Sequence, residues 1–112
     1  MDQDQNKRLG EVELLVLLAL VSLGEDAYGV AVQKELARRT RRATSFGTVY
    51  TTLARLEAKG FIDARLGDPT PERGGRRKKY FRLLPTGRRA ATASLRLLRT
   101  MTRGLGASWQ LL

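Results

Sequence analysis

Residues 44–62 have the sequence TSFGTVYTTLARLEAKGFI, in which a helix lies between a start signal and a stop signal. Thr44 and Ser45 offer hydroxyls that can cap the first helical amides, and Gly60 ends a helix about fifteen residues later. At helical spacing one side gathers the apolar residues Phe46, Val49, Leu53 and Leu56. The other side gathers Thr48, Thr51, Thr52, Arg55 and Lys59. The stretch therefore predicts a helix with one buried face and one exposed face of hydroxyls and cations.

That exposed face has the chemistry of a helix that enters the major groove of DNA. Hydroxyls and cations bind phosphates and base edges, and none of the five residues is a carboxylate. Glu57 falls toward the flank of the helix. On this helix alone, an ordinary amphipathic helix with a solvated face explains the pattern equally well, so the neighbouring segments must decide.

The flanking segments predict two further helices before this one and a hairpin and helix after it. Residues 11–23 are nearly unbroken Leu and Val ending at Gly24, and residues 28–39 form a shorter amphipathic pattern that ends in the basic segment 38–42. From Phe61 the period changes to two, which predicts a strand, and a second strand runs over residues 79–84. The Gly- and Pro-rich residues 67–78 form the hairpin tip. Pro85 suits the first turn of a last helix over residues 85–103.

This order of elements is that of a winged helix-turn-helix. We expect a mainly α fold with a small β hairpin, comprising three helices, a two-stranded wing and a C-terminal helix. In that helix a seam at alternating steps of three and four residues predicts packing against another helix, and glycines 104 and 106 interrupt it. The seam residues are Ala91, Ser94, Leu98, Met101 and Leu105.

The hairpin carries a dense cluster of positive charge in a segment where repulsion serves no packing purpose. The cluster consists of Arg73, Arg76, Arg77, Lys78 and Lys79. Binding to phosphates would relieve the repulsion, and a dimer that used such contacts would show a salt-dependence slope of about −6 or steeper. A merely soluble loop is the alternative.

Composition restricts the function classes further. The chain has 112 residues, which fits one domain, and 21 Lys and Arg against 11 Asp and Glu give a net charge of +10. Residues 1–37 hold three basic and seven acidic residues, whereas residues 38–112 hold eighteen basic and four acidic residues. A cationic surface can simply confer solubility, but this uneven placement indicates a polyanionic partner.

Cysteine and histidine are both absent from the sequence. Their absence removes disulfides, thiolate zinc sites, the usual general base and most transition-metal ligands, so we expect no enzyme, no cofactor and no metal site. The apolar run over residues 14–21 is shorter than the roughly 20 residues that cross a bilayer. We therefore expect a cytoplasmic protein without a membrane segment.

Several motifs together resemble the PadR family of transcription regulators. The signature consists of Phe46-Gly47-Thr48-Val49-Tyr50, Leu53, Arg55-Leu56-Glu57 and Gly60-Phe61-Ile62, followed by Arg76-Arg77-Lys78-Lys79-Tyr80-Phe81 and Gly87. The opening segment from Leu9-Gly10-Glu11 to Tyr28-Gly29 also matches, so the resemblance covers about residues 9–103. The chain departs from the family pattern at two places. It has Leu84-Pro85 in place of a capping Thr, so the sequence defines the start of the last helix only to within a turn. It also lacks a Trp near Leu66.

The resemblance implies a homodimeric regulator, usually a repressor, that binds double-stranded operator DNA. We expect DNA contacts from Ser45, Thr48, Tyr50, Thr51, Thr52, Arg55, Arg73, Arg76, Arg77, Lys78 and Lys79. Of these, the resemblance itself points to Thr48, Tyr50, Thr51, Arg55, Arg76, Arg77, Lys78 and Lys79. We expect the dimer interface to include Leu14, Leu18, Ala91, Leu95, Leu98, Met101 and Leu105. Tyr50 could instead pack against the second helix or the wing. Glu57 is expected to have a structural role, such as pairing with a nearby Arg. The implied domains are a flexible terminus (1–8), the winged helix (9–84) and a dimerisation helix with its tail (85–112).

Some PadR-like proteins bind flat aromatic effectors at the dimer interface, and Trp109 is the single Trp of this chain. It either anchors the tail against the first helix or lines a small pocket. A non-specific basic protein, architectural or RNA-associated, remains the alternative function, and a carboxylate-dependent hydrolase is disfavoured because the available acids lie in or beside the basic hairpin.

Overall fold

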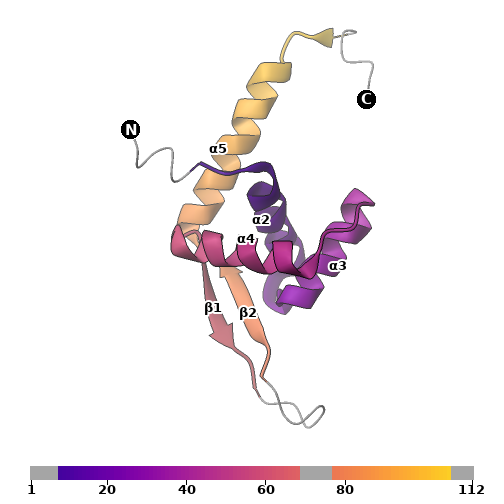
Figure 1. Ribbon diagram of the computed structural model, residues 1–112. Coiled ribbons are helices and arrows are strands. Elements are labelled where there is room, and N and C mark those ends of the chain that lie inside the picture. Colours follow the sequence, from indigo (N-terminus) through magenta and orange to yellow (C-terminus); the bar gives the residue numbers. More distant parts are fainter. Residues whose placement is uncertain (1–7, 69–76, 107–112) are drawn as a thin grey trace.

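The computed structural model describes residues 8–68 and 77–106, and in these segments the protein is mostly helical with a two-stranded antiparallel sheet (Figure 1). The elements are α2 (Glu11–Leu23), η1 (Gly24–Asp26), α3 (Gly29–Thr40), α4 (Phe46–Ala58), β1 (Ile62–Leu66), β2 (Lys79–Leu83) and α5 (Pro85–Thr102). The predicted winged-helix fold class is confirmed.

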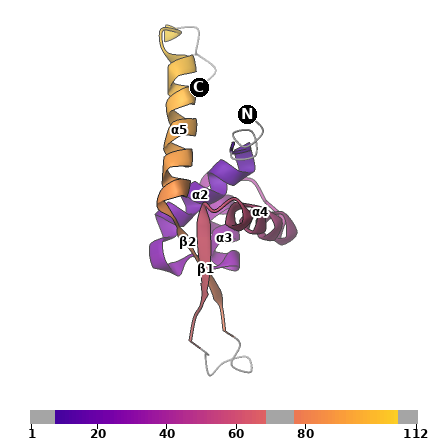
Figure 2. The same cartoon turned by 90° about the vertical axis from the view of Figure 1, so that its left-hand side faces the viewer.

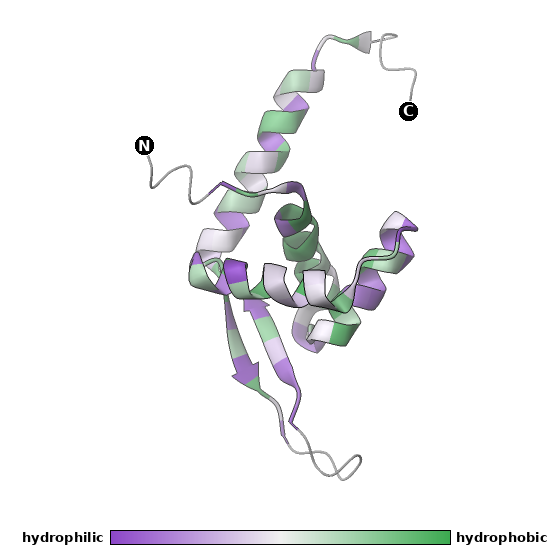
Figure 3. Ribbon diagram, viewed as in Figure 1, coloured by the Kyte–Doolittle hydropathy of each residue, from purple (hydrophilic) through white to green (hydrophobic). Residues whose placement is uncertain are grey.

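Helix α2 forms the centre of the molecule. Its first turn is closed by the Glu13 carboxylate, which accepts a hydrogen bond from the Gly10 amide at 2.8 Å, and it ends at Gly24, whose φ of 60° favours glycine. Helix α2 is itself strongly hydrophobic (Figure 3), and α3, α4 and α5 all pack against it. In the described segments, the buried core comes from all four α-helices, both strands and two connecting residues: Val16, Leu17, Ala19, Leu20, Ala27, Val32, Leu36, Val49, Leu53, Leu56, Phe61, Ile62, Phe81 and Ala91.

A short turn connects α3 to α4 and fixes where α4 begins. The Gln33 side-chain amide donates to the carbonyl of Thr44 at 2.9 Å, which ties the end of the turn to α3. Ser45 then caps α4 by accepting a hydrogen bond from the Thr48 amide at 3.0 Å. The predicted capping hydroxyl is therefore confirmed, and α4 starts at Phe46.

The hairpin pairs β1 with β2 in a register that runs from Ile62–Leu83 to Leu66–Lys79. On its other edge β2 is held by the segment before α3, because the Phe81 amide donates to the Ala27 carbonyl at 2.8 Å and Tyr28 forms a bridge with Tyr80. Both ribbon views show the hairpin projecting away from the helices (Figures 1 and 2). Its base is buried, whereas Leu66 near the tip is exposed.

Helix α5 begins at Pro85, with Leu84 as an N-cap that supplies no side-chain hydrogen bond, which resolves the predicted uncertainty in its start. Close packing fixes this first turn: a Cβ at Gly87 would lie only 2.2 Å from the carbonyl oxygen of Phe61. The second half of α5 extends beyond the other elements (Figure 2). Leu95, Leu98 and Met101 are exposed there.

Two of the predicted interface residues do not fit the continuous seam. Ala91 is buried in the core of its own protomer, because the first half of α5 packs against α2. Leu105 lies beyond the helix, which ends at Thr102 and is followed by Gly104 with a φ of 80°. Leu14 is partly buried against the core, and Leu18 lies beside α3 in a surface hollow. The exposed stripe is therefore shorter than the sequence pattern predicted.

In the segments that the structure describes, none of the helices combines the length and the apolar character needed to cross a membrane.

Candidate nucleic-acid interface

The outward face of α4 forms a shallow concavity of small, hydroxyl and cationic residues. It is lined by Ser45, Gly47, Thr48, Thr51, Thr52 and Arg55. The Ser45 hydroxyl donates to Thr48 Oγ1 at 2.8 Å, which leaves the hydrogen of the Thr48 hydroxyl available to an external acceptor. Thr51 and Arg55 follow on the same exposed face. The arrangement offers both hydroxyl and guanidinium donors to a groove.

Two residues predicted on that exposed face lie elsewhere. Thr52 is only 5% exposed, and its hydroxyl donates to the Thr48 carbonyl at 2.7 Å, so it forms the floor of the concavity. Lys59 points back to α2, where its Nζ donates to both carboxylate oxygens of Glu13, at 2.8 and 2.9 Å. Both residues are turned inward because α2 packs against this side of α4. Phe46, in contrast, was predicted in the core but is 37% exposed. The buried face is rotated relative to the apolar pattern.

The Lys59–Glu13 contact joins the end of α4 to the start of α2. Burial alone would raise the pKa of the Glu13 carboxyl, but hydrogen bonds from Lys59 and from the Gly10 amide outweigh burial and lower it. Lys59 Nζ also donates to the carbonyl of Arg8 at 2.9 Å. Lys59 thus positions α4 and is not available to DNA.

Tyr50 packs against a neighbouring helix and is also partly exposed. Its ring packs edge-on against Phe46, with centroids 4.8 Å apart, and it lies next to Gly29 at the start of α3. Nearly half of the residue is exposed all the same. Tyr50 therefore packs against α3, as the structural alternative predicted, and still borders the outward face of α4.

The cations of the wing are held by aromatic and acidic neighbours. Lys78 Nζ lies 4.3 Å from the ring centroid of Tyr28, and Arg65 lies 4.8 Å from that of Tyr80. Lys79 Nζ lies 3.6 Å from Glu57 Oε1, so Glu57 pairs with a lysine and not with the arginine that was predicted. Arg77 is exposed just before β2. Arg73 and Arg76 lie outside the described residues, as does Trp109.

A cross-strand ion pair joins the two strands of the hairpin. Arg82 donates to both carboxylate oxygens of Asp63, at 3.1 and 2.6 Å. The hydrogen bond from the Arg82 guanidinium lowers the pKa of Asp63, and burial only partly opposes this shift. The charges of this pair cancel on the hairpin, which leaves the residues closer to the tip to supply its net positive charge.

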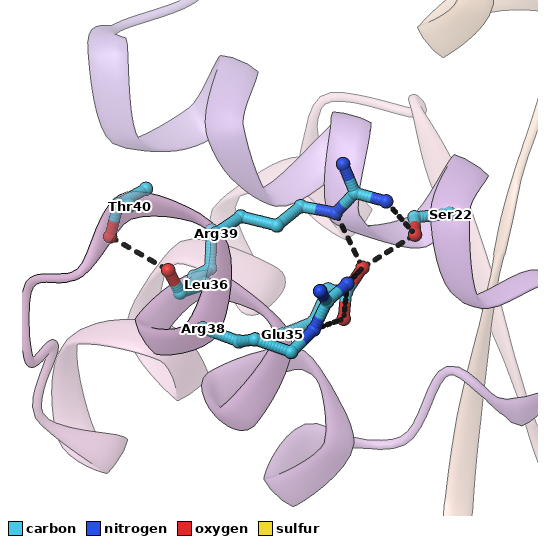
Figure 4. A network of polar contacts seen from close by, with 6 residues as sticks. All are labelled: Ser22, Glu35, Leu36, Arg38, Arg39 and Thr40. Carbon is cyan, nitrogen blue, oxygen red and sulfur yellow. Dashed lines mark hydrogen bonds and ion pairs between the residues drawn. The ribbon is translucent and has the colours of Figure 1, made fainter.

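The structure divides the basic segment 38–42, at the end of α3, into two parts. Arg38 and Arg39 both bind the carboxylate of Glu35, and the Ser22 hydroxyl donates to Glu35 and accepts from Arg39 (Figure 4). Hydrogen bonds from Ser22, Arg39 and Arg38 lower the pKa of Glu35 to about 2. This network joins α3 to α2, so these two arginines serve the fold.

Arg41 and Arg42, in contrast, are exposed in the turn immediately before α4. In the described parts of the chain, no carboxylate lies within ion-pair distance of either one. Arg41 holds a left-handed φ of 56°, and the Thr40 hydroxyl accepts from the Arg42 amide at 3.3 Å. From the sequence, the whole basic segment 38–42 was predicted to end the helix. The sequence feature that distinguishes the two parts is Glu35, one turn earlier, because its carboxylate pairs with Arg38 and Arg39 only.

No cluster of three potential metal ligands occurs in residues 8–68 and 77–106. The lining of the α4 concavity consists of small, hydroxyl and cationic residues.

Comparisons with known proteins agree with this fold. The Transcriptional regulator PadR-like family matches residues 17–93 of the chain. Transcriptional regulator Rv3488 of Mycobacterium tuberculosis is 35% identical over 80 residues, which cover 70% of this chain and 68% of that protein. An uncharacterized protein of Lysinibacillus sphaericus is 35% identical over 75 residues, or 65% of each chain. The chain thus spans about two thirds of the length of the curated relatives it matches.

Solved structures share the fold. A PadR family transcription regulator from Clostridium difficile superposes with a TM-score of 0.70 at 23% identity, covering 86% of this chain and 95% of that one. A PadR family transcriptional regulator from Eggerthella lenta gives a TM-score of 0.66 at 29% identity, covering 82% and 78%. The chain therefore belongs to the PadR-like family of transcriptional regulators, which are DNA-binding proteins and not enzymes.

Proposed function

We propose that this protein is a sequence-specific repressor that binds operator DNA as a homodimer in the cytoplasm. The observation that carries the proposal is the outward face of α4, where Thr48, Thr51 and Arg55 are exposed around one concavity. Such a face reads base edges when its helix enters the major groove, and a guanidinium favours guanine. Ser45 has a shared role, because its hydroxyl both caps α4 and orients Thr48.

Contacts to the phosphate backbone come from both sides of α4. The wing contributes the described residues Arg77, Lys78 and Lys79, to which we add Arg73 and Arg76. At the opposite end of α4, Arg41 and Arg42 lie exposed in the turn. These contacts fix the register of the protein on the duplex and supply the salt-dependent part of the affinity.

A second copy of the chain would cover the apolar stripe of α5. Leu95, Leu98 and Met101 are 38, 56 and 69% exposed, which is unusual for large apolar side chains that remain in water. A mostly apolar hollow between α2 and α3, lined by Leu15, Leu18 and Val21, offers a matching surface. A two-fold arrangement would bury both surfaces twice and present two copies of α4 to one operator. Residues 9–84 then form the DNA-binding unit and residues 85–112 the dimerisation unit.

Release by a flat aromatic effector at the dimer interface completes the proposal. Trp109 would either anchor the tail or face that effector. Because it is the single Trp of the chain, its fluorescence reports on either role without labelling. An effector that binds there should quench this fluorescence and lower operator affinity over the same concentration range.

Hydroxyl-radical footprinting on a duplex selected by the protein tests the proposal. A specific homodimer protects two inverted half-sites about 34–36 Å apart, or a multiple of that spacing. A non-specific basic protein, the alternative function, would enrich no duplex from a random pool and would protect DNA uniformly.

A further inference from the structure

Glu57 occupies an unexpected position for an acidic residue. It is the single carboxylate within residues 46–58, the helix whose outward face we assign to DNA. Its side chain is 40% exposed, and its Oε1 atom lies 3.6 Å from Nζ of Lys79, at the start of β2. A carboxylate this close to phosphates opposes binding, so its presence on α4 calls for a physical reason.

Stability does not supply that reason. Lys79 is 44% exposed, and ion pairs between exposed side chains stabilise a fold very little. The other described carboxylates with ion-pair partners hold cations that we do not assign to DNA: Glu13 binds Lys59, Glu35 binds Arg38 and Arg39, and Asp63 binds Arg82. Glu57 differs because its partner, Lys79, is one of the cations that we assign to phosphate.

The contact also joins the two parts of the interface. Lys79 pairs with Leu66 in the hairpin register, and its Nζ lies 5.5 Å from the ring centroid of Phe81. Glu57 reaches across from α4 to the same ammonium group. The position of this cation relative to α4 is therefore set by the recognition helix itself.

We propose that Glu57 is a specificity-determining residue of this protein, and this inference rests on the proposed function. On unselected DNA, where affinity comes from phosphate neutralisation alone, Glu57 cancels the charge of Lys79 and weakens binding. On a cognate operator, α4 is seated in the groove, and Glu57 then holds Lys79 in a fixed orientation toward one phosphate. Repulsion between the Glu57 carboxylate and the phosphates lowers affinity for both kinds of DNA. The fixed orientation of Lys79 offsets this loss of affinity only in the specific complex.

Glu57→Gln tests the inference, with Asp63→Asn as a matched control. Both variants remove one exposed negative charge that pairs with a cation of the hairpin. Affinity for a random duplex and for a duplex selected from a random pool by the wild type is measured by fluorescence anisotropy between about 50 and 300 mM salt. A thermal melt of each variant confirms that it is folded.

We expect Glu57→Gln to raise affinity for the random duplex about three- to tenfold and to steepen the salt slope by about one unit per subunit. Affinity for the selected duplex should change less than about twofold, so the specificity ratio falls. Asp63→Asn should leave that ratio unchanged. In a Lys79→Gln background, Glu57→Gln should no longer lower the ratio, because the cation that Glu57 orients is gone.

Equal effects of Glu57→Gln and Asp63→Asn would overturn the inference, since they would show a response to net charge only. An unchanged ratio in Glu57→Gln would overturn it as well. If the wild type itself selects no duplex, the proposed function has failed first, and the two failures are thereby distinguished.

Discussion

Arg55 and Arg77 carry the same charge but occupy different parts of the surface that we propose to bind DNA. Arg55 is exposed on α4 within the concavity, whereas Arg77 precedes β2 in the wing. Arg55→Ala should weaken operator binding by about 1–3 kcal/mol and random binding much less, because a base contact is lost. Arg77→Ala should weaken both equally and reduce the salt slope by about one unit. Competition titrations measure both effects, and identical ratios in the two variants would contradict this assignment.

At Arg41, a substitution can separate an effect on fold stability from an effect on DNA affinity. Its left-handed φ of 56° is accessible to glycine without strain, and the residue caps the end of α3. Arg41→Gly should therefore keep or raise the melting temperature while it weakens binding to any duplex. Arg38→Gln, which removes an arginine bound to Glu35, is the control and should lower stability without a specific loss of DNA affinity. Unchanged DNA affinity in Arg41→Gly would remove Arg41 from the interface.

At the scale of elements, the junction between α4, β1 and α5 depends on Gly87. A Cβ there would meet the Phe61 carbonyl oxygen at 2.2 Å and a Leu83 methyl carbon at 2.8 Å. Because backbone cannot move aside cheaply, Gly87→Ala should destabilise the fold by about 1–3 kcal/mol in urea unfolding. Gly47→Ala is the control, since its Cβ would approach nothing closer than Ser45 Oγ at 4.0 Å. Equal stability of the two variants would show that α5 can shift away.

The joint between α2 and α3 should respond to acid through Glu35. Its folded pKa is lowered from its ordinary value of 4.5 to about 2, so its contribution to stability is complete above about pH 4.5 and is lost as pH falls toward 2. Glu35→Gln should lose stability less steeply than the wild type over this range, in thermal melts recorded from pH 7 to 2. Glu13 and Asp63 have lowered pKa values too, so both proteins still weaken in acid. Parallel curves would show that the Glu35 network does not couple to folding.

The sequence predicted the elements well because each has a local signal. Ser45 and Gly60 bound α4, Gly24 ends α2, and Pro85 begins α5, all within a residue or two of the observed limits. Side-chain burial was harder to predict because it depends on the neighbouring helix. Thr52 looked exposed by polarity, yet its hydroxyl is satisfied by the Thr48 carbonyl, which lets the residue lie in the buried face. Lys59 was predicted on the exposed face of α4 and Ala91 at the dimer interface, because the sequence did not show that each faces α2.

At the scale of the whole molecule, the exposed stripe of α5 should control assembly. Leu98→Asp places a charge in the proposed apolar interface, so it should shift the protein to monomer at micromolar concentration in sedimentation velocity. Thr100→Asp, on the opposite side of α5 by helical spacing, should leave the dimer intact. The Leu98→Asp monomer should also lose most of its operator affinity, because one α4 contacts only one half-site. A wild type that is monomeric under the same conditions would contradict the assigned interface.

The proposed domain arrangement predicts that substitutions in α5 can change folding and assembly separately. In α5, Gly87 and Ala91 are buried in the core, whereas the large apolar side chains of Leu95, Leu98 and Met101 are exposed in the second half, which is the part that we assign to a partner. Variants in the first half should alter folding, and variants in the second half should alter assembly. Comparing urea unfolding with sedimentation for both sets of variants separates the two roles.

Specific recognition of DNA is tested most directly by fluorescence anisotropy with labelled DNA from upstream of the protein's own gene. The titration is made at about 150 mM salt with random duplex as competitor. We predict saturable binding that survives a large excess of competitor, with a preference of about a thousandfold or more for the specific fragment. Binding that any duplex abolishes equally, for this fragment and for fragments selected by the protein from the whole genome, would contradict a sequence-specific regulator.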